Sequence, residues 1–224
     1  MVIAALIAAL NEERSIAAVV SGAARHAPLV IVVDDGSTDR TADRAREAGA
    51  TVLRHDRNHG KGSAIRTGLE FVLAQECSHV LFMDGDLQHD PGEIPLLIAR
   101  ASQGAGDFVI GEREFRKGSM PASRYYSNVV GSAILSRFIG APVMDSQSGF
   151  RLIRASLLRQ LRLTGTRYEI ETEMLIKLVR LGATLDRVTV RRLTYADTRS
   201  KIHPFRDTSR TCFLAVRYRY LSWS

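Results

Sequence analysis

Cysteine and long apolar runs are both scarce in this sequence of 224 residues. The two cysteines, Cys77 and Cys212, stand far apart and without the spacing of a metal or redox pair, which disfavours a disulfide scaffold and indicates a reducing compartment. No stretch reaches the ~18 apolar residues that a bilayer-spanning helix needs. The apolar residues 1–10 lack a basic leading region and run into Asn11-Glu12-Glu13, which favours a first buried strand over a signal peptide. We therefore expect a soluble or peripheral protein.

Acidic residues are in the minority, with 24 Asp and Glu against 31 Lys and Arg and a formal net charge of +7. Such an excess suits nucleic acid, an anionic membrane or phosphate-bearing substrates. A nucleic-acid-binding module is the disfavoured alternative, because the basic residues cluster after acidic loops and no stacking motif is evident. A hydrophobic content of 45% is enough for a substantial core.

Short apolar runs alternate with helical patterns along the first third of the chain. The runs at 2–9, 29–33 and 51–54 predict strands, and the patterns at 16–24, 42–48 and 64–73 predict helices. Repeated strand-helix order predicts an α/β fold with a mostly parallel central sheet covered on both faces. Ligands of such sheets bind at the carboxyl edge of the strands.

Polar clusters at 11–13, 34–39 and 84–86 follow the apolar runs at 2–9, 29–33 and 79–83, each a predicted strand, and so meet at that edge. Asp84-Gly85-Asp86, with Gln88 two positions on, offers hard oxygen ligands for a divalent cation that takes its other ligands from water and a substrate's phosphates. The alternative is a plain Asp-Gly turn. The adjacent Asp34 and Asp35 would repel each other unless they bound something, such as a base N–H or ribose hydroxyls. One of Ser37, Thr38 and Asp39 is expected to cap a helix that begins near Arg40.

The segment 58–64, Asn-His-Gly-Lys-Gly-Ser-Ala, is similar to a phosphate-binding loop. Its glycines expose backbone N–H groups and Lys61 adds charge at a helix start, although it is not a Walker A sequence. A flexible loop that leads into the helix is the alternative.

Five segments together carry a family resemblance: Asn11-Glu12, 33–39, 58–62, 84–88 and 145–151. In this order and spacing they resemble an inverting family 2 glycosyltransferase of the dolichyl- or polyprenyl-phosphate mannose synthase type. The match runs from the first strand to about Arg210. The resemblance implies a Rossmann-like GT-A fold over 1–206, a GDP- or UDP-hexose donor, Mg²⁺ or Mn²⁺, and a polyprenyl or dolichyl phosphate acceptor.

The resemblance also implies roles for individual residues. Asp84, Asp86 and Gln88 match the metal-binding motif, and the predicted catalytic residues are Asp86, Arg113 and Arg124. The implied donor contacts are Ala8, Leu10, Glu12, Asp35, Lys61, Asp84 and Gly85. The family usually has Pro and Tyr where this chain has Ala8-Ala9-Leu10, so the choice between guanine and uracil stays open.

Arginines follow in the second half of the chain. Residues 111–121 are basic and end in glycine and proline, which predicts a mobile loop over the metal site. The resemblance implies that Arg113 and Arg124 bind donor and acceptor phosphates, work that suits the planar guanidinium fork. It places the acceptor phosphate at Arg124, Ser127, Asn128, Arg199 and Lys201. For Arg116 and Lys117 a solvated loop face is favoured.

The acceptor decides the mechanism, because a hydroxyl acceptor needs a general base whereas a phosphate monoester already carries a nucleophilic oxygen. Carboxylates that could serve as a base are Asp145, Glu169, Glu171 and Glu173. The three glutamates could instead stabilise the positive end of a helix, and Asp145, predicted to be site-adjacent, could form a turn. A soluble hydroxyl acceptor remains the alternative function.

The last segment, 207–224, interleaves aromatic and aliphatic residues with arginines. This pattern predicts a tail that lies at an anionic membrane surface on the cytoplasmic side. A last helix packed on the core is the alternative.

Overall fold

The computed structural model describes most of the chain up to residue 193: residues 1–104, 106–113, 131–133, 135–137, 140, 143, 145, 148–191 and 193. The predicted tail at 207–224 lies outside the described residues, as do these predicted site residues: Arg124, Ser127, Asn128, Arg199 and Lys201. No helix in the described part of the chain is long and apolar enough to cross a bilayer.

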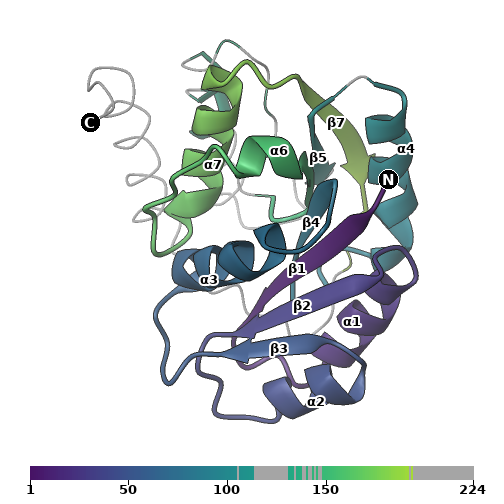
Figure 1. Ribbon diagram of the computed structural model, residues 1–224, viewed down its shortest axis with the longest axis vertical. Coiled ribbons are helices and arrows are strands. Elements are labelled where there is room, and N and C mark those ends of the chain that lie inside the picture. Colours follow the sequence, from purple (N-terminus) through teal and green to yellow (C-terminus); the bar gives the residue numbers. More distant parts are fainter. Residues whose placement is uncertain are drawn as a thin grey trace.

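A seven-stranded sheet forms the centre of the molecule (Figure 1), in the order β3-β2-β1-β4-β6-β5-β7. The strands are β1 (Ile3–Ala9), β2 (Leu29–Asp34), β3 (Thr51–Arg54), β4 (His79–Asp84), β5 (Phe108–Arg113), β6 (Arg151–Arg154) and β7 (Leu185–Val190). Only β6 is antiparallel to its neighbours, so the predicted mostly parallel α/β sheet is confirmed.

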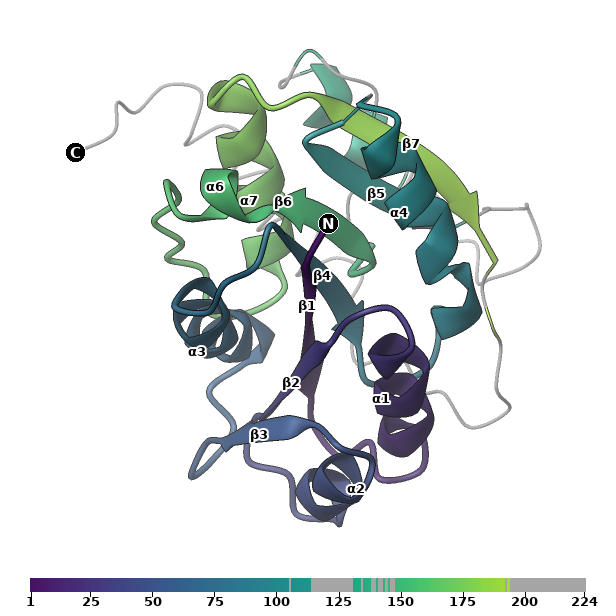
Figure 2. The same cartoon turned by 45° about the vertical axis from the view of Figure 1, so that its right-hand side comes forward.

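Helices cover both faces of the sheet (Figure 2). One face carries α1 (Ile16–Ala24), α2 (Thr41–Glu47) and α4 (Ile94–Ser102), and the other carries α3 (Lys61–Leu73), α6 (Ala155–Leu158) and α7 (Glu169–Arg180). Alternate residues of β1 enter the two cores, since Leu6 packs on the α3 and α7 side while Ala5 and Ile7 pack on the other. Burial on both faces explains why β1 is a continuous apolar run.

The predicted elements agree closely with the observed ones over the first 84 residues. The helix at 16–24 and the strand at 51–54 have the expected bounds, while α3 begins at Lys61, three residues earlier than its apolar pattern indicates. The prediction of a mobile loop from residue 111 is wrong up to Arg113, because these residues complete β5. Gly111 fits there since a Cβ would lie only 2.7 Å from the Phe150 ring.

The strand order reverses direction between β1 and β4, which pair in register with Ala8 opposite Asp84. From β1 the chain continues outward through β2 and β3 and then returns to β4 on the other side of β1. Beyond β4 lie β6, β5 and β7 in spatial order. In an open parallel sheet this point leaves a crevice at the carboxyl ends of the strands, where ligands bind. The loops after β1 and β4, which carry Glu12 and Asp86, lie at this point.

Candidate active site

The loops after β1, β2 and β4 are tied together by side-chain hydrogen bonds. Ser37 Oγ accepts from the Asn11 N–H at 2.8 Å, and Thr41 Oγ1 accepts from the Glu12 N–H at 2.7 Å. Ser15 Oγ donates to the Gly85 carbonyl at 2.7 Å. Asn11 adopts a left-handed φ of 54°, which asparagine tolerates better than most residues. The rim that presents Glu12 and Gly85 is therefore built as one unit.

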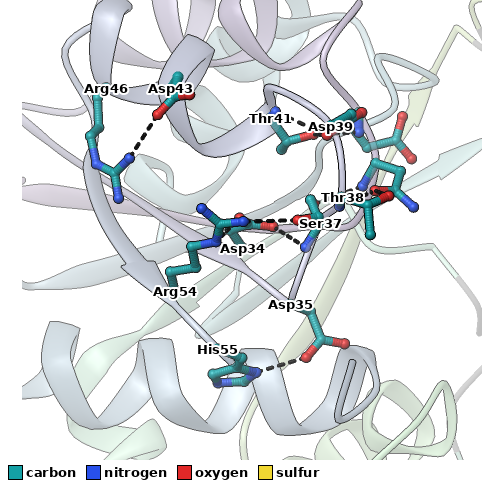
Figure 3. A network of polar contacts seen from close by, with 12 residues as sticks. Asp34, Asp35, Ser37, Thr38, Asp39, Thr41, Asp43, Arg46, Arg54 and His55 are labelled. Carbon is teal, nitrogen blue, oxygen red and sulfur yellow. Dashed lines mark hydrogen bonds and ion pairs between the residues drawn. The ribbon is translucent and has the colours of Figure 1, made fainter. Parts of the chain in front are cut away.

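Asp34 and Asp35 both have protein partners (Figure 3). Asp34 accepts from the Ser37 N–H at 3.0 Å and pairs with Arg54 Nε at 3.2 Å. Asp35 Oδ1 lies 2.7 Å from His55 Nδ1 and 2.9 Å from the donating N–H of residue 59, and its Oδ2 accepts from that of residue 60 at 2.8 Å. The expectation that these carboxylates need a ligand to relieve their repulsion is therefore wrong. A carboxylate offers about four acceptor positions, so Asp35 keeps about one for a ligand.

The N-cap residue of α2 is Arg40, which makes no side-chain cap hydrogen bond, so the expected cap at Ser37, Thr38 or Asp39 is wrong. Asp39 lies one residue earlier, and its Oδ1 accepts from the backbone N–H of Thr41, the first residue of α2, at 3.0 Å. Its Oδ2 accepts from the Glu13 N–H at 3.2 Å, which joins the start of α2 to the first loop.

Asp84 ends β4 and meets Lys61 from the start of α3. The Lys61 Nζ lies 2.5 Å from Asp84 Oδ1. Gly149 packs on the same carboxylate so closely that a Cβ there would lie 2.6 Å from Asp84 Oδ2. The position of Asp84 is therefore set from two sides.

Asp86 follows two residues later and is held by Gln88. The Gln88 backbone N–H donates to Asp86 Oδ1 at 3.0 Å and its Nε2 donates to Oδ2 at 2.6 Å. Leu87 between them adopts a left-handed φ of 59°, an uncommon conformation for a leucine. This strained turn brings Asp86 and Gln88 together beside the end of β4.

The two aspartates differ in their electrostatics. Burial, reinforced by the negative charges of Asp84 and Glu12, raises the pKa of Asp86 to about 6. Burial also disfavours the ionised form of Asp84, but the Lys61 ammonium outweighs it and holds the pKa of that carboxyl below its usual range. Among the described residues, no cation pairs directly with Asp86 as Lys61 pairs with Asp84, although the charge of Lys61 lowers the pKa of Asp86 somewhat.

These residues fit a divalent cation of one particular kind. The described residues contain no group of three or more His, Cys, Asp or Glu side chains arranged to hold a metal. Asp84 and Asp86 supply two carboxylates, and Asp86 would gain from a nearby positive charge. Mg²⁺ and Mn²⁺ suit such a site because they can take most of their ligands from water and phosphate oxygens.

Lys61 also contacts α7, because its Nζ lies 2.6 Å from Glu171 Oε1. The neighbouring glycines allow α3 to pack against the loop before α7, since a Cβ on Gly62 would lie 2.6 Å from the Gly165 carbonyl oxygen. The Ser63 N–H donates to the Thr166 carbonyl at 3.2 Å. The 58–64 segment is thus packed on protein backbone and is not an open phosphate cradle, although Lys61 itself reaches the site.

A pocket lies beneath this lysine. Its lining combines the charged side chains with apolar residues of β1, β4, α3 and α7: Leu6, Ala8, Lys61, Ile65, Phe82, Met83, Asp84, Gly149, Arg151, Glu171 and Met174. Ala8, a predicted donor contact, thus lies beside Asp84. Leu10 and Glu12 follow on the adjoining rim.

Arg113 ends β5 and forms a bidentate ion pair with Asp145. Its Nε lies 2.6 Å from Asp145 Oδ2 and its Nη2 lies 3.0 Å from Oδ1. The Asp145 side chain is fully buried. The structure thus places Asp145 beside the site as the counter-ion that orients Arg113.

The glutamates of α7 have separate partners. Glu169 accepts from the backbone N–H groups of residues 166 and 167, both at 3.1 Å, and so satisfies donors at the helix start. Glu173 is buried, pairs with Lys177 at 2.7 Å and accepts from the Gly165 N–H at 2.7 Å. Glu171 is the one of these three glutamates that contacts Lys61.

Two residues at the site had no role in the sequence prediction, His89 and Arg151. The His89 ring is buried, lies 5.2 Å from the Phe150 ring, and has a pKa lowered to about 4 by burial and then by Arg113. Arg151 is 1% exposed and donates to the carbonyls of Ser148 and Glu171, both at 2.7 Å. Both lie in segments that the motifs singled out, but only tertiary packing reveals their contacts.

The fold and the site together define a GT-A glycosyltransferase. Its mostly parallel sheet carries acidic loops that suit a divalent metal at the carboxyl edge, together with the positively charged side chains of Lys61 and Arg113. The model of the family "Glycosyl transferase family 2" matches residues 4–162, and the chain belongs to that family. The predicted family, fold and enzyme class are confirmed.

Several relatives are named as transferases of lipid phosphates. A UDP-N-acetylglucosamine--dolichyl-phosphate N-acetylglucosaminyltransferase of Methanococcus voltae is 31% identical over 76% of this chain and 77% of its own length. An undecaprenyl-phosphate mannosyltransferase of Micrococcus luteus is 30% identical over 72% and 70% of the two chains. A dolichol-phosphate mannosyltransferase of Pyrococcus furiosus is 33% identical over 66% of this chain and 44% of that protein.

Among solved structures, a glucosyl-3-phosphoglycerate synthase of Mycobacterium tuberculosis in complex with uridine diphosphate is similar, with a TM-score of 0.74. It is 26% identical, and the alignment covers 97% of this chain and 79% of that one. A second structure of that enzyme, with Mn²⁺, uridine diphosphate and glucosyl-3-phosphoglycerate, has a TM-score of 0.77 at 24% identity and bears on the fold.

Proposed function

We propose that this protein transfers a hexose, mannose or glucose, from a GDP- or UDP-sugar to a polyprenyl or dolichyl phosphate, with Mg²⁺ or Mn²⁺. An oxygen of the lipid phosphate forms a bond to the anomeric carbon while the bond from that carbon to the donor's diphosphate breaks. Attack from the side opposite the diphosphate inverts the anomeric configuration, so an α-linked donor yields a β-linked product.

The main support for a lipid-phosphate acceptor is that the carboxylates that could act as a general base already have protein partners. Asp145, Glu169, Glu171 and Glu173 are the candidates for a general base, and each is engaged by protein groups. Asp145 is also fully buried within its bidentate pair with Arg113. A phosphate acceptor needs no such base, since its oxygen is already anionic near neutral pH.

The cations of the site suit two anionic reactants. Lys61 contacts Asp84 directly, and the positive charges of Lys61 and Arg113 both lower the pKa of Asp84 against the effect of burial. Preorganised positive charge lowers the barrier when a diphosphate departs. A bound divalent ion would add a Lewis acid that stabilises this leaving group, held by Asp84, Asp86 and Gln88.

The remaining assignments complete the proposal. Ala8, Leu10, Glu12, Asp35 and Gly85 form the donor side. Residues 1–206 form the catalytic domain, and 207–224 bind the anionic membrane surface on the cytoplasmic side. The names of the dolichyl-phosphate and undecaprenyl-phosphate transferases among the relatives support the lipid-phosphate acceptor.

The test is transfer from a panel of labelled GDP- and UDP-sugars to a short polyprenyl phosphate with Mg²⁺ or Mn²⁺. We expect a lipid-linked product that disappears with chelator and in Asp86→Ala. Anomeric NMR of the product checks the stereochemistry, and retention would contradict the single displacement.

A second candidate function is transfer to a small hydroxyl compound that carries a phosphate, which the name of the similar Mycobacterium tuberculosis synthase favours. The same panel with 3-phosphoglycerate in place of the lipid separates the two acceptors. Transfer only to the soluble acceptor would replace the lipid in the proposal and leave the donor side unchanged.

A further inference from the structure

One lysine serves two carboxylates at the centre of the site. The Lys61 Nζ lies 2.5 Å from Asp84 Oδ1 and 2.6 Å from Glu171 Oε1. Its side chain is 16% exposed, and that of Glu171 is 6% exposed. The ammonium therefore already occupies one oxygen of a carboxylate that a divalent cation would need.

Gly149 limits on one side how far Asp84 can turn away from this lysine, while 27% of the Asp84 side chain is exposed. Gly149 packs on the carboxylate so tightly that a Cβ would lie 3.0 Å from both Cγ and Oδ1 and 2.6 Å from Oδ2. A cation shared by Asp84 and Asp86 thus approaches an Asp84 whose charge is already paired. Either the lysine moves or it shares the oxygen with the cation.

We propose that Lys61 is an internal competitor of the divalent cation for Asp84, and that Glu171 is the positioning residue that retains Lys61 when the cation binds. This inference rests on the metal-dependent transfer proposed above. Glu171 thereby sets how readily Asp84 is released to the metal, and it lies on α7, far along the chain from the acidic loops.

The surroundings of Glu171 suit this work. Burying an ammonium without a partner is costly, so Lys61 can leave Asp84 only if another carboxylate still pairs with it. Glu171 is anchored through its own backbone, because its carbonyl accepts from Arg151 Nη1 at 2.7 Å. The Lys61 Nζ also lies 5.8 Å from the centre of the ring of Tyr168, the residue that precedes α7. The contacts that would hold Lys61 after it leaves Asp84, with Glu171 and Tyr168, are therefore already present.

The test measures Mn²⁺ affinity by electron paramagnetic resonance on the full chain without nucleotide. Lys61→Met should bind Mn²⁺ about tenfold more tightly, the factor expected when one charge-assisted hydrogen bond no longer competes. Glu171→Gln should bind it about tenfold more weakly, because Lys61 then stays with Asp84. In the double variant the Glu171→Gln effect should vanish, since there is no lysine to retain.

Glu169→Gln is the matched control, since it removes a negative charge from the same helix without touching Lys61, and its Mn²⁺ affinity should equal that of the wild type. Thermal unfolding checks each variant. If Lys61→Met does not fold, Lys61→Gln takes its place, because it keeps an N–H donor for Glu171 without the charge.

Two results would overturn the inference and leave the proposed function standing. The first is unchanged or weaker Mn²⁺ binding by the Lys61 variant. The second is an equal loss on Glu171→Gln in both backgrounds, which would make Glu171 a general source of negative potential. Failure of wild type and variants to bind Mn²⁺, even with UDP or GDP, would remove the proposed metal dependence together with this inference.

Discussion

Gly149 offers a direct way to move a metal-type carboxylate without changing it. A Cβ added by Gly149→Ala would lie 2.6 Å from Asp84 Oδ2, whereas ordinary contact begins at 3.4 Å. Asp84 must therefore shift by about 0.8 Å, and Lys61 limits its retreat from the other side. Overpacking of this kind costs about 1–3 kcal/mol of unfolding free energy.

The effect on transfer should be much larger than the effect on stability. A displacement close to 1 Å at a reacting centre can reduce the rate by about 10²-fold. We expect thermal unfolding to show that Gly149→Ala is folded at the assay temperature. The variant should transfer sugar about 10²-fold more slowly than the wild type and bind Mn²⁺ more weakly. The first assay measures kcat/KM for sugar transfer from the donor to the lipid phosphate, and the second is a Mn²⁺ titration that gives the affinity for the ion.

Gly92→Ala is the matched control for the added methyl group. Gly92 is exposed, and the nearest atom to a Cβ added there would be the end of the flexible Asp90 side chain, at 3.0 Å. Wild-type transfer and Mn²⁺ affinity in Gly149→Ala would refute the reasoning, because Asp84 would then have either no role in the metal site or freedom to relax.

Three further predictions follow from the described contacts. Asp86→Asn should be more stable than the wild type at pH 8 in chelator, because the folded protein raises the pKa of Asp86 from its ordinary value of 3.8 to about 6 and so disfavours the ionised carboxylate. Denaturant titration should show that this gain in unfolding free energy vanishes below about pH 4, and a gain that is constant with pH would contradict the prediction. Glu173→Gln should lower the free energy of unfolding by about 3 kcal/mol, since it leaves the buried Lys177 ammonium without its carboxylate partner. A loss under ~1 kcal/mol in chemical denaturation would show that this ion pair contributes little to stability. UDP should bind more tightly than GDP in calorimetry, because the protein leaves about one acceptor position on Asp35, which suits the one N–H of uracil and not the two neighbouring donors of guanine. Tighter binding of GDP would exclude a hydrogen bond from the base to Asp35.

Local patterns were sufficient for the first part of the fold. The helix at 16–24 shows one apolar face and could be bounded from the sequence. The strand at 51–54 lies at the edge of the sheet and is only partly buried, yet its short apolar centre between polar residues was sufficient to bound it. The segment around Gly111 was misjudged because a strand glycine has the same local signature as a loop glycine. Its place in β5 depends on Phe150, which is distant in the sequence.

The sequence by itself determined which chemistry is present and at which edge of the sheet it lies, because each acidic cluster directly follows a strand and parallel strands end at a common rim. Only the tertiary structure decided which charges are paired. Asp35 meets His55, Asp145 meets Arg113, and Lys61 is shared by Asp84 and Glu171. Pairing depends on distances of a few ångströms between segments far apart in the chain, and Coulomb interactions and hydrogen bonds at that range leave no periodic trace in a sequence.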